Sequence, residues 1–314
     1  MERKLLVIDG PTASGKTSLS VAVAEKIGGE IISADSMQIY KGLDVGTSKV
    51  TESETKGIKH HMIDIVEPSV NYSVSDYVDS ATKIIDELLN KGVQPIVVGG
   101  TGFYIDALLY KKSLGSVGFD ENVREKYYAF AKEHGNEALY RKLCEIDPIS
   151  AAKLSPNDIK RVVRALEIFE TTGVCKSQQN DVEKRYDYKM YCIDMPREEL
   201  YSRIEARVDE MVKLGLFDEV KGLLEHLKQN STALSAIGYK EIVEYFNGNV
   251  SKDEAIAKIK LNTRHYAKRQ LTYFRHQFDC VYVSSELSVE EKRDYVLNDF
   301  YSKKKDVLRI NTTN

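Results

Sequence analysis

Short apolar runs alternate with stretches of helical periodicity along the first hundred residues of the chain. Leu5–Ile8, Glu30–Ser33 and Pro95–Val98 are short runs dominated by apolar residues, which is the pattern of buried strands. Between them, Lys16–Ile27 and the segment that follows Ser73 carry apolar residues at helical spacing. Strands that alternate with helices predict a parallel sheet flanked by helices, so the predicted fold class is α/β.

The alternation stops after this part of the chain. Charged segments of helical pattern, rich in Tyr and Ala, come next, and Tyr188–Ile193 then has the pattern of a strand again. We therefore predict an α/β core formed by residues 1–112 and 186–314, the second part of which ends in helices. Residues 113–185 are predicted to form an all-helical insertion domain.

Length and composition indicate a globular protein with a full hydrophobic core. With 314 residues and 42% hydrophobic content, the chain can bury a full core. No stretch reaches the ~18–20 apolar residues of a membrane span, and the first apolar run ends at Asp9, too early for a signal peptide. The four cysteines are far apart and form no C-x-x-C pair, so we expect neither disulfides nor a zinc site. We expect a cytoplasmic protein without membrane association.

A formal charge of −3 argues against a nonspecific nucleic-acid binder, but the cations are clustered locally. Ser251 and Glu254 form a capping box that predicts a long helix to about Gln277. One side of this helix would carry Lys260, Arg264, Lys268 and Arg275. A solvated charged face is the simpler interpretation of one such helix. A second acid-poor face with Arg161 and Arg164 favours contact with RNA.

A glycine-rich loop lies between the first predicted strand and the first predicted helix. It matches G-x-x-x-x-G-K-[ST] and consists of Gly10, Pro11, Thr12, Ala13, Ser14, Gly15, Lys16 and Thr17. In such a loop, backbone N–H groups and the positive helix end converge on a diphosphate. Lys16 supplies a point charge, and the Thr17 hydroxyl can ligate Mg²⁺. The loop predicts a diphosphate-bearing ligand without deciding whether that ligand is ATP.

Asp35 follows the second predicted strand at its carboxyl end, where ligands bind in open α/β sheets. The pattern alone leaves three interpretations open: a Mg²⁺ ligand, a general base for an incoming nucleophile, or an Asx-type turn without chemistry. The neighbouring Ser36 and Gln38 offer donors and acceptors that can read a base edge, and Gln is suited to adenine. These neighbours favour a role beside a nucleotide base.

Several ordered motifs resemble those of the tRNA dimethylallyltransferases, also called tRNA isopentenyltransferases. Besides the phosphate loop, they are Ile32–Tyr40, Asp44–Thr47, Val98–Tyr104, Asn157-Asp158 with Arg161, Arg164–Glu167, Ala236–Glu241, and Thr263-Arg264 with Tyr266–Gln270. Together they cover nearly the whole chain. The sequence shows no C-terminal zinc finger of the kind that eukaryotic members carry, so the resemblance is to the bacterial type.

The resemblance implies transfer of the dimethylallyl group from dimethylallyl diphosphate to the exocyclic N6 amine of an adenine in tRNA, with release of diphosphate. The target would be the adenine 3′ to the anticodon in tRNAs that read codons beginning with U. The loop would hold the donor's diphosphate together with Mg²⁺. Arg207 matches an arginine on that diphosphate, and Asp35 matches the general base. The implied catalytic residues are Asp35, Lys16, Thr17 and Arg207.

The resemblance also implies which residues bind the tRNA anticodon stem-loop, with the helical insertion embracing the RNA. Some would hold the target base and others would contact the RNA from the insertion or from the long basic helix. They are Asp35, Ser36, Met37, Gln38, Thr101, Arg124, Ile159, Lys160, Arg161, Val162, Val163, Arg264 and Lys268.

Three other functions remain as alternatives. In a small-molecule or nucleotide kinase, the loop would hold ATP and Asp35 would activate a hydroxyl. The strand at Pro95–Val98 runs into two glycines, however, and not into an aspartate that could hold Mg²⁺. An adenylate isopentenyltransferase would use the same local residues, while a non-catalytic RNA-binding protein would not need the intact loop. We expect the protein to act as a monomer.

Overall fold

The structure, a computed structural model, describes residues 4–111, 120–178 and 183–302. The chain divides into two compact units: a core unit of Met1–Leu109 with Arg185–Asn314, and an insertion unit of Tyr110–Lys184. The predicted start of the insertion, residue 113, lies outside the described residues. Its predicted last residue, Arg185, belongs to the core unit, where its amide donates to the Leu109 carbonyl at 2.8 Å.

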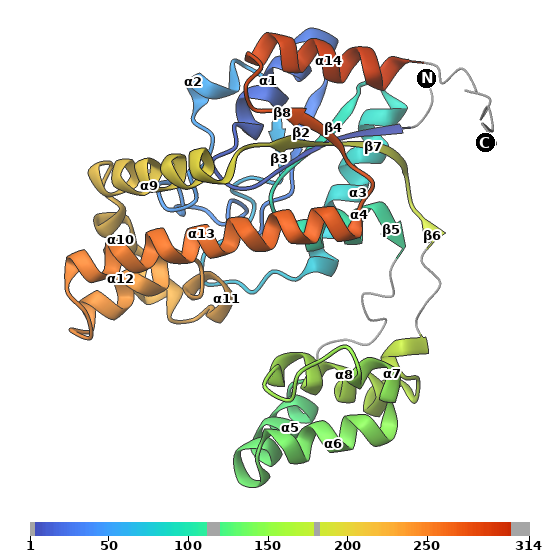
Figure 1. The fold of residues 1–314 in the computed structure, drawn as a ribbon, viewed down its shortest axis with the longest axis vertical. Coiled ribbons are helices and arrows are strands. Elements are labelled where there is room, and N and C mark those ends of the chain that lie inside the picture. The colour runs from blue at the N-terminus through green and yellow to red at the C-terminus, as the bar shows by residue number, and fades with distance from the viewer. Residues whose placement is uncertain (1–3, 112–119, 179–182, 303–314) are drawn as a thin grey trace, which may run out of the picture. The chain divides into compact units, whose positions relative to one another are not determined.

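A six-stranded parallel sheet forms the centre of the core unit, in the order β3-β2-β4-β1-β7-β8 (Figure 1). Its register pairs Ile8 of β1 with Val98 on one side and with Tyr191 on the other. The parallel order brings the carboxyl ends of β1, β2 and β4 to one edge, as the alternating pattern predicts. The strands are β1 (Lys4–Asp9), β2 (Glu30–Ser33), β3 (His60–His61), β4 (Pro95–Val98), β7 (Asp187–Asp194) and β8 (Val281–Ser284).

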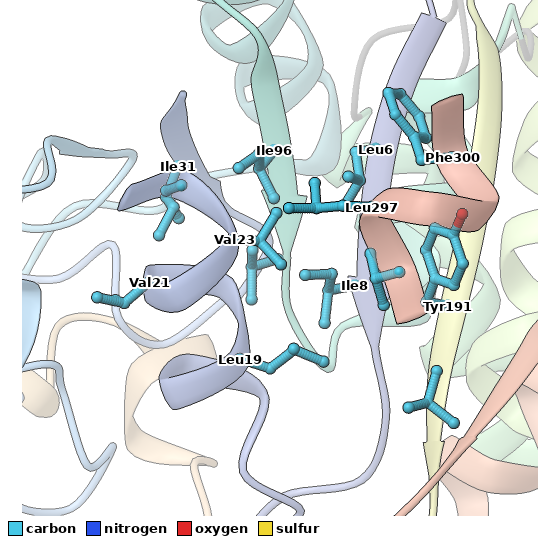
Figure 2. Close-up of a cluster of buried hydrophobic side chains, with 14 of the residues drawn as sticks. Leu6, Ile8, Leu19, Val21, Val23, Ile31, Ile96, Tyr191, Leu297 and Phe300 are labelled. Carbon is cyan, nitrogen blue, oxygen red and sulfur yellow. The ribbon is translucent and has the colours of Figure 1, made fainter. Parts of the chain in front are cut away.

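Helices flank this sheet, which confirms the predicted fold class. On one face, α1 packs against α14, and both cover apolar residues of the strands. Figure 2 shows Leu6 and Ile8 of β1 in one cluster with Val23 of α1 and Leu297 of α14. On the other face, the Tyr77 hydroxyl of α3 donates to the Ser33 carbonyl at 3.1 Å. The flanking helices are α1 (Lys16–Ile27), α2 (Glu52–Thr55), α3 (Val74–Asn90), α4 (Gly102–Leu109) and α14 (Val289–Tyr301).

A second group of helices follows β7. Its apolar residues share one hydrophobic cluster with Ile39 and Tyr40, which come shortly after β2. This cluster ties the segment after β2 to helices that lie more than 150 residues later in the chain. The helices are α9 (Arg197–Lys213), α10 (Leu216–Leu227), α11 (Ser231–Leu234), α12 (Tyr239–Phe246) and α13 (Lys252–Gln277). The predicted capping box of Ser251 and Glu254 opens α13.

The insertion unit has a small hydrophobic core of its own, which includes Tyr127, Leu143 and Leu166. Its helical elements are α5 (Glu121–His134), α6 (Asn136–Ile146), α7 (Pro148–Ala151), α8 (Ile159–Thr172) and the 3-10 turn Lys176–Gln178. Two short antiparallel strands, β5 (Tyr110–Lys111) and β6 (Glu183–Lys184), also belong to it. The sequence predicts an all-helical insertion and neither of these strands, because two-residue strands carry no periodic signal.

Among the described residues, no helix is both long enough and apolar enough to cross a membrane.

Candidate active site

The phosphate loop connects the carboxyl end of β1 to the start of α1. Gly15 precedes the helix with φ 91°, in the left-handed region that glycine tolerates, and no side chain caps the helix there. The first turn of α1 therefore presents backbone N–H groups and the positive end of the helix dipole at the loop. All eight predicted loop residues lie in this strand–loop–helix arrangement.

Two cations meet at this loop. The Lys16 Nζ atom donates to the Pro11 carbonyl at 2.7 Å, and Arg207 reaches in from α9. The Arg207 Nη1 atom donates to the Thr12 hydroxyl oxygen at 3.5 Å. Burial, followed by the charge of Arg207, lowers the pKa of Lys16 to about 8. The loop thus holds two like charges that an anionic ligand would stabilise.

Asp35 lies just beyond β2 and forms a turn. Its Oδ1 atom accepts the backbone amides of Met37 at 2.9 Å and Gln38 at 3.3 Å. This is the Asx-type turn that the sequence left open as one of three interpretations. Both bonds use Oδ1, so the turn does not engage the second carboxylate oxygen, Oδ2. The turn therefore leaves the general-base interpretation possible.

The segment after Asp35 is held by its neighbours. The Ser36 amide donates to the Thr101 hydroxyl oxygen at 3.1 Å, which places two predicted tRNA-binding residues in contact. The Gln38 Nε2 atom donates to the Thr47 carbonyl at 3.2 Å. This bond uses one of the two N–H donors of Nε2, so the second N–H and the Oε1 acceptor remain for pairing with a base edge.

Two cavities open around these residues in the core unit. The first, of about 100 Å³, is lined by Lys16, Thr17 and Gln38 among others. The second, of about 320 Å³, has an apolar wall formed by Met37, Ile204, Val208, Met211, Ile237 and Ile259. Asp35 and Arg207 line both cavities. A site for an anion thus adjoins an apolar space, with a carboxylate and a guanidinium at the boundary.

Gln270 of α13 bridges the phosphate loop and the turn after β4. This buried side chain accepts the Thr12 amide at 3.0 Å and donates to the Gly100 carbonyl at 2.7 Å. A Cβ atom at Gly100 would lie 2.2 Å from the Gln270 Nε2 atom, so a larger residue there would have to displace this amide from the Gly100 carbonyl. Gln270 ends the motif Tyr266–Gln270, but the sequence does not predict its bridging role, because contacts across 170 to 258 residues leave no local pattern.

Asp9, the last residue of β1, is another residue near the loop for which the sequence predicts no role. It is buried directly before the phosphate loop, and its Oδ1 atom has no hydrogen-bond partner among the described residues. Burial raises the pKa of Asp9 to about 7. Its only sequence signal is an acid at the end of an apolar run, which is a common way for a strand to end.

The predicted tRNA-binding residues of α13 are partly neutralised. Arg264 forms an ion pair with Glu205 of α9, and Lys260 pairs with Asp209 at 2.6 Å. Lys268, in contrast, is exposed to solvent. The predicted acid-poor face is therefore wrong as a description of this surface, because α9 supplies acids that a single-helix pattern cannot show.

The other predicted tRNA-binding residues lie in the insertion unit. Lys160 and Arg161 are exposed near the start of α8, and Ile159 is half-buried. Val162 and Val163 are each only 1% exposed, so their side chains pack in the core of the insertion unit and cannot face RNA. Arg124 forms an ion pair with the buried Glu167 at 2.8 Å.

Comparisons with known proteins agree with one another. The family described as IPP transferase matches residues 38–277. A protein of Geobacillus kaustophilus named tRNA dimethylallyltransferase is 48% identical over 280 residues, which cover 88% of this chain and 89% of that protein. Among solved structures, the full-length tRNA isopentenylpyrophosphate transferase of Bacillus halodurans has a TM-score of 0.73 and 43% identity, over 95% of this chain and 96% of that one. A eukaryotic dimethylallyltransferase acting on tRNA has a TM-score of 0.81 and 29% identity, over 95% of this chain and 79% of that one.

Proposed function

The chain belongs to the IPP transferase family as a tRNA dimethylallyltransferase, and on this premise we propose how its core unit carries out the reaction. The family predicted from the ordered motifs is thereby confirmed. The enzyme transfers a dimethylallyl group to tRNA. We propose that the donor is dimethylallyl diphosphate. The acceptor is the exocyclic N6 amine of the adenine 3′ to the anticodon, in tRNAs that read codons beginning with U.

One observation carries this proposal: a cationic loop adjoins an apolar cavity, with Asp35 and Arg207 at the boundary of the two. The donor has the same two halves, a charged diphosphate and an apolar allyl group. The loop Gly10–Thr17 binds the diphosphate, while the apolar wall shelters the five-carbon group from water. Lys16, Arg207 and the loop amides stabilise the charge that develops on the departing diphosphate oxygen.

Mg²⁺ fits this site through Thr17. The Thr17 side chain lies at the start of α1 and lines the same cavity as Lys16. Among the described residues, no group of three His, Cys, Asp or Glu side chains could hold a metal ion. A single hydroxyl ligand beside a bound diphosphate suits Mg²⁺, which takes oxygen ligands and usually keeps several waters and substrate phosphates. When bound, Mg²⁺ would neutralise negative charge on the diphosphate.

Asp35 acts as the general base. As the bond forms between the adenine nitrogen and the allyl carbon, the bond from that carbon to the diphosphate oxygen breaks. The proton of the amine passes to the Oδ2 atom of Asp35, while its Oδ1 atom keeps the amides of Met37 and Gln38. The adenine must leave its stack to reach this position, as bases do in other base-modifying enzymes.

The anticodon stem-loop is the proposed partner of the exposed cations. Lys268 in the core unit and Lys160 and Arg161 in the insertion unit are exposed and can meet phosphates, although Arg161 also pairs with Asp158 at 3.4 Å. We place the enzyme in the cytoplasm, because its acceptor is tRNA. We propose that the enzyme acts as a monomer.

The test is to incubate the purified protein with Mg²⁺ and labelled dimethylallyl diphosphate. Unmodified anticodon stem-loop and adenosine monophosphate serve as separate acceptors, and labelled ATP is tried in parallel. The proposal expects label in the stem-loop, on the adenine 3′ to the anticodon. Label in the free nucleotide alone would indicate an adenylate isopentenyltransferase. Turnover of ATP alone would indicate a kinase.

A further inference from the structure

Glu219 of α10 gathers four hydrogen-bond donors around one carboxylate. Its Oε2 atom accepts the amides of Asp44 at 3.0 Å and Val45 at 2.6 Å. Its Oε1 atom accepts the amide of Gly46 at 3.0 Å and the hydroxyl of Tyr239 at 2.6 Å. Successive backbone N–H groups that converge in this way form an anion-binding nest. Here the anion is a side chain of the protein itself, 173 residues or more away along the sequence.

Tyr239 of α12 packs under the same loop. A Cβ atom at Gly46 would lie 2.5 Å from the Tyr239 ring, so the backbone lies close against the hydroxyl end of this side chain. Tyr239 is fully buried, and burial followed by the charge of Glu219 raises its pKa far above the ordinary value. The tyrosine therefore stays protonated and remains a donor to Glu219 at any physiological pH.

The loop held by Glu219 leads to the proposed acceptor site. The Thr47 carbonyl, one residue beyond the nest, accepts the Gln38 Nε2 atom at 3.2 Å. Gln38 in turn donates its backbone amide to the Asp35 Oδ1 atom at 3.3 Å. Gly46 and Thr47 also line the larger cavity. A continuous chain of contacts thus runs from Glu219 through the loop to the residue proposed as general base.

The phosphate loop is held by different contacts. Its Thr12 amide donates to Gln270, and the Thr12 hydroxyl accepts from Arg207. Neither residue belongs to α10 or α12. Thr47 and Gln38 also line the smaller cavity, so a disturbance at Glu219 would enter the site through these two residues, whereas the phosphate loop keeps its own contacts.

We propose that Glu219, supported by Tyr239, is a positioning residue for the target adenine. It orders the loop Asp44–Thr47, and through Thr47 it sets the orientation of Gln38 and of the turn at Asp35. The inference rests on the proposed function, because it assigns the acceptor side of the site to a tRNA base. It adds a residue outside the cavities to the machinery that selects that base.

The test uses Glu219→Gln with Glu225→Gln as its control. Gln can still accept two amides through its carbonyl, and its NH₂ group can donate to the Tyr239 hydroxyl, but the Gly46 N–H then faces a donor and loses its acceptor. Because an unsatisfied donor costs about 1–3 kcal/mol, kcat/KM for the stem-loop should fall by roughly tenfold to a hundredfold. The affinity for dimethylallyl diphosphate, measured by equilibrium dialysis, should fall by a much smaller factor, because the phosphate loop keeps its contacts with Gln270 and Arg207. Glu225 is exposed on the same helix, and its change should alter neither quantity.

Tyr239→Phe is the second variant, because it leaves all three amides in place. It should lower kcat/KM for the stem-loop by a smaller factor than Glu219→Gln does, and it should again change donor affinity less than stem-loop kinetics. An equal loss of donor and acceptor binding together with a lower Tm would overturn the proposal in favour of a general scaffold role. Unchanged stem-loop kinetics in both variants would overturn it too. Absence of transfer by the wild-type protein would instead refute the proposed function.

Discussion

Asp35 divides two tasks between the oxygens of one carboxylate. Oδ1 accepts the amides of Met37 and Gln38 and so shapes the turn after β2. Oδ2 is left for the proposed proton transfer. The turn interpretation and the base interpretation, which compete when only the sequence is considered, are therefore compatible in the same side chain. A substitution that separates the two tasks is a direct test of the base.

Asp35→Asn makes that separation. Asn keeps an oxygen that can accept both amides, so the turn and the binding of the stem-loop should persist. It cannot accept the proton, and single-turnover transfer should fall by about 10²–10⁴-fold, the usual contribution of general-base catalysis. Asp35→Ala removes both tasks and should weaken binding as well. If Asp35→Asn lost binding and transfer in equal measure, the residue would be structural.

Lys16 gives the donor site a pH dependence. In the free protein its pKa is lowered to about 8 by burial and by Arg207, so it is charged below that pH and neutral above it. A bound diphosphate favours the charged form, which raises the pKa and makes binding take up a proton. Affinity for dimethylallyl diphosphate should therefore weaken by up to about tenfold per pH unit above pH 8.

Calorimetry in two buffers of different ionisation enthalpy, between pH 7.5 and 9.5, measures this proton uptake. This pH range lies above the pKa of Asp9, the buried carboxyl group directly before the loop, which is about 7. Lys16→Arg keeps its charge throughout the range and should flatten the dependence. An affinity independent of pH in the wild-type protein would show that Lys16 is charged whether or not the donor is bound.

At the scale of elements, local signals predict the sheet well and long-range contacts poorly. Glu30–Ser33 and Pro95–Val98 are strands with the predicted bounds, because an apolar run between turn residues is a local pattern. Ser73 caps α3 through its bond with Asp76, another local signal. The Gln270 bridge has no such signal, since its partners are more than 150 residues away. The phosphate loop is predictable because its eight residues are contiguous. Glu219 is not predictable, because the amides that it accepts lie 173 or more residues away.

The ion pairs between α13 and α9 are also long-range contacts that the sequence pattern does not predict. They lead to a test of RNA binding. Arg264 is paired with Glu205, whereas Lys268 is exposed. Lys268→Ala should weaken stem-loop binding and make the plot of log affinity against log salt shallower by about one. Arg264→Ala should have a smaller effect, because Glu205 already screens that charge. Glu205→Ala frees Arg264 and should strengthen binding. If Glu205→Ala left the affinity unchanged, Arg264 would not face RNA.

At the scale of the whole molecule, the insertion leaves and rejoins the core through neighbouring residues. The Arg185 amide donates to the Leu109 carbonyl at 2.8 Å, and the β5–β6 ladder pairs Lys111 with Glu183. The insertion unit has its own hydrophobic core, and both cavities are lined by the core unit alone. Donor binding and the insertion should therefore be separable, although the proposed partner contacts residues of both units.

Replacing residues 112–182 by an Asn-Gly turn tests this separation. The replacement should fold, because Lys111 already lies opposite Glu183 and Asn-Gly suits a two-residue hairpin. The shortened protein should bind dimethylallyl diphosphate as the wild type does, in equilibrium dialysis. Its affinity for the stem-loop should fall sharply, because the exposed Lys160 and Arg161 are gone. Loss of donor binding in a folded product would place the insertion in the donor site, whereas unchanged stem-loop affinity would remove it from RNA recognition.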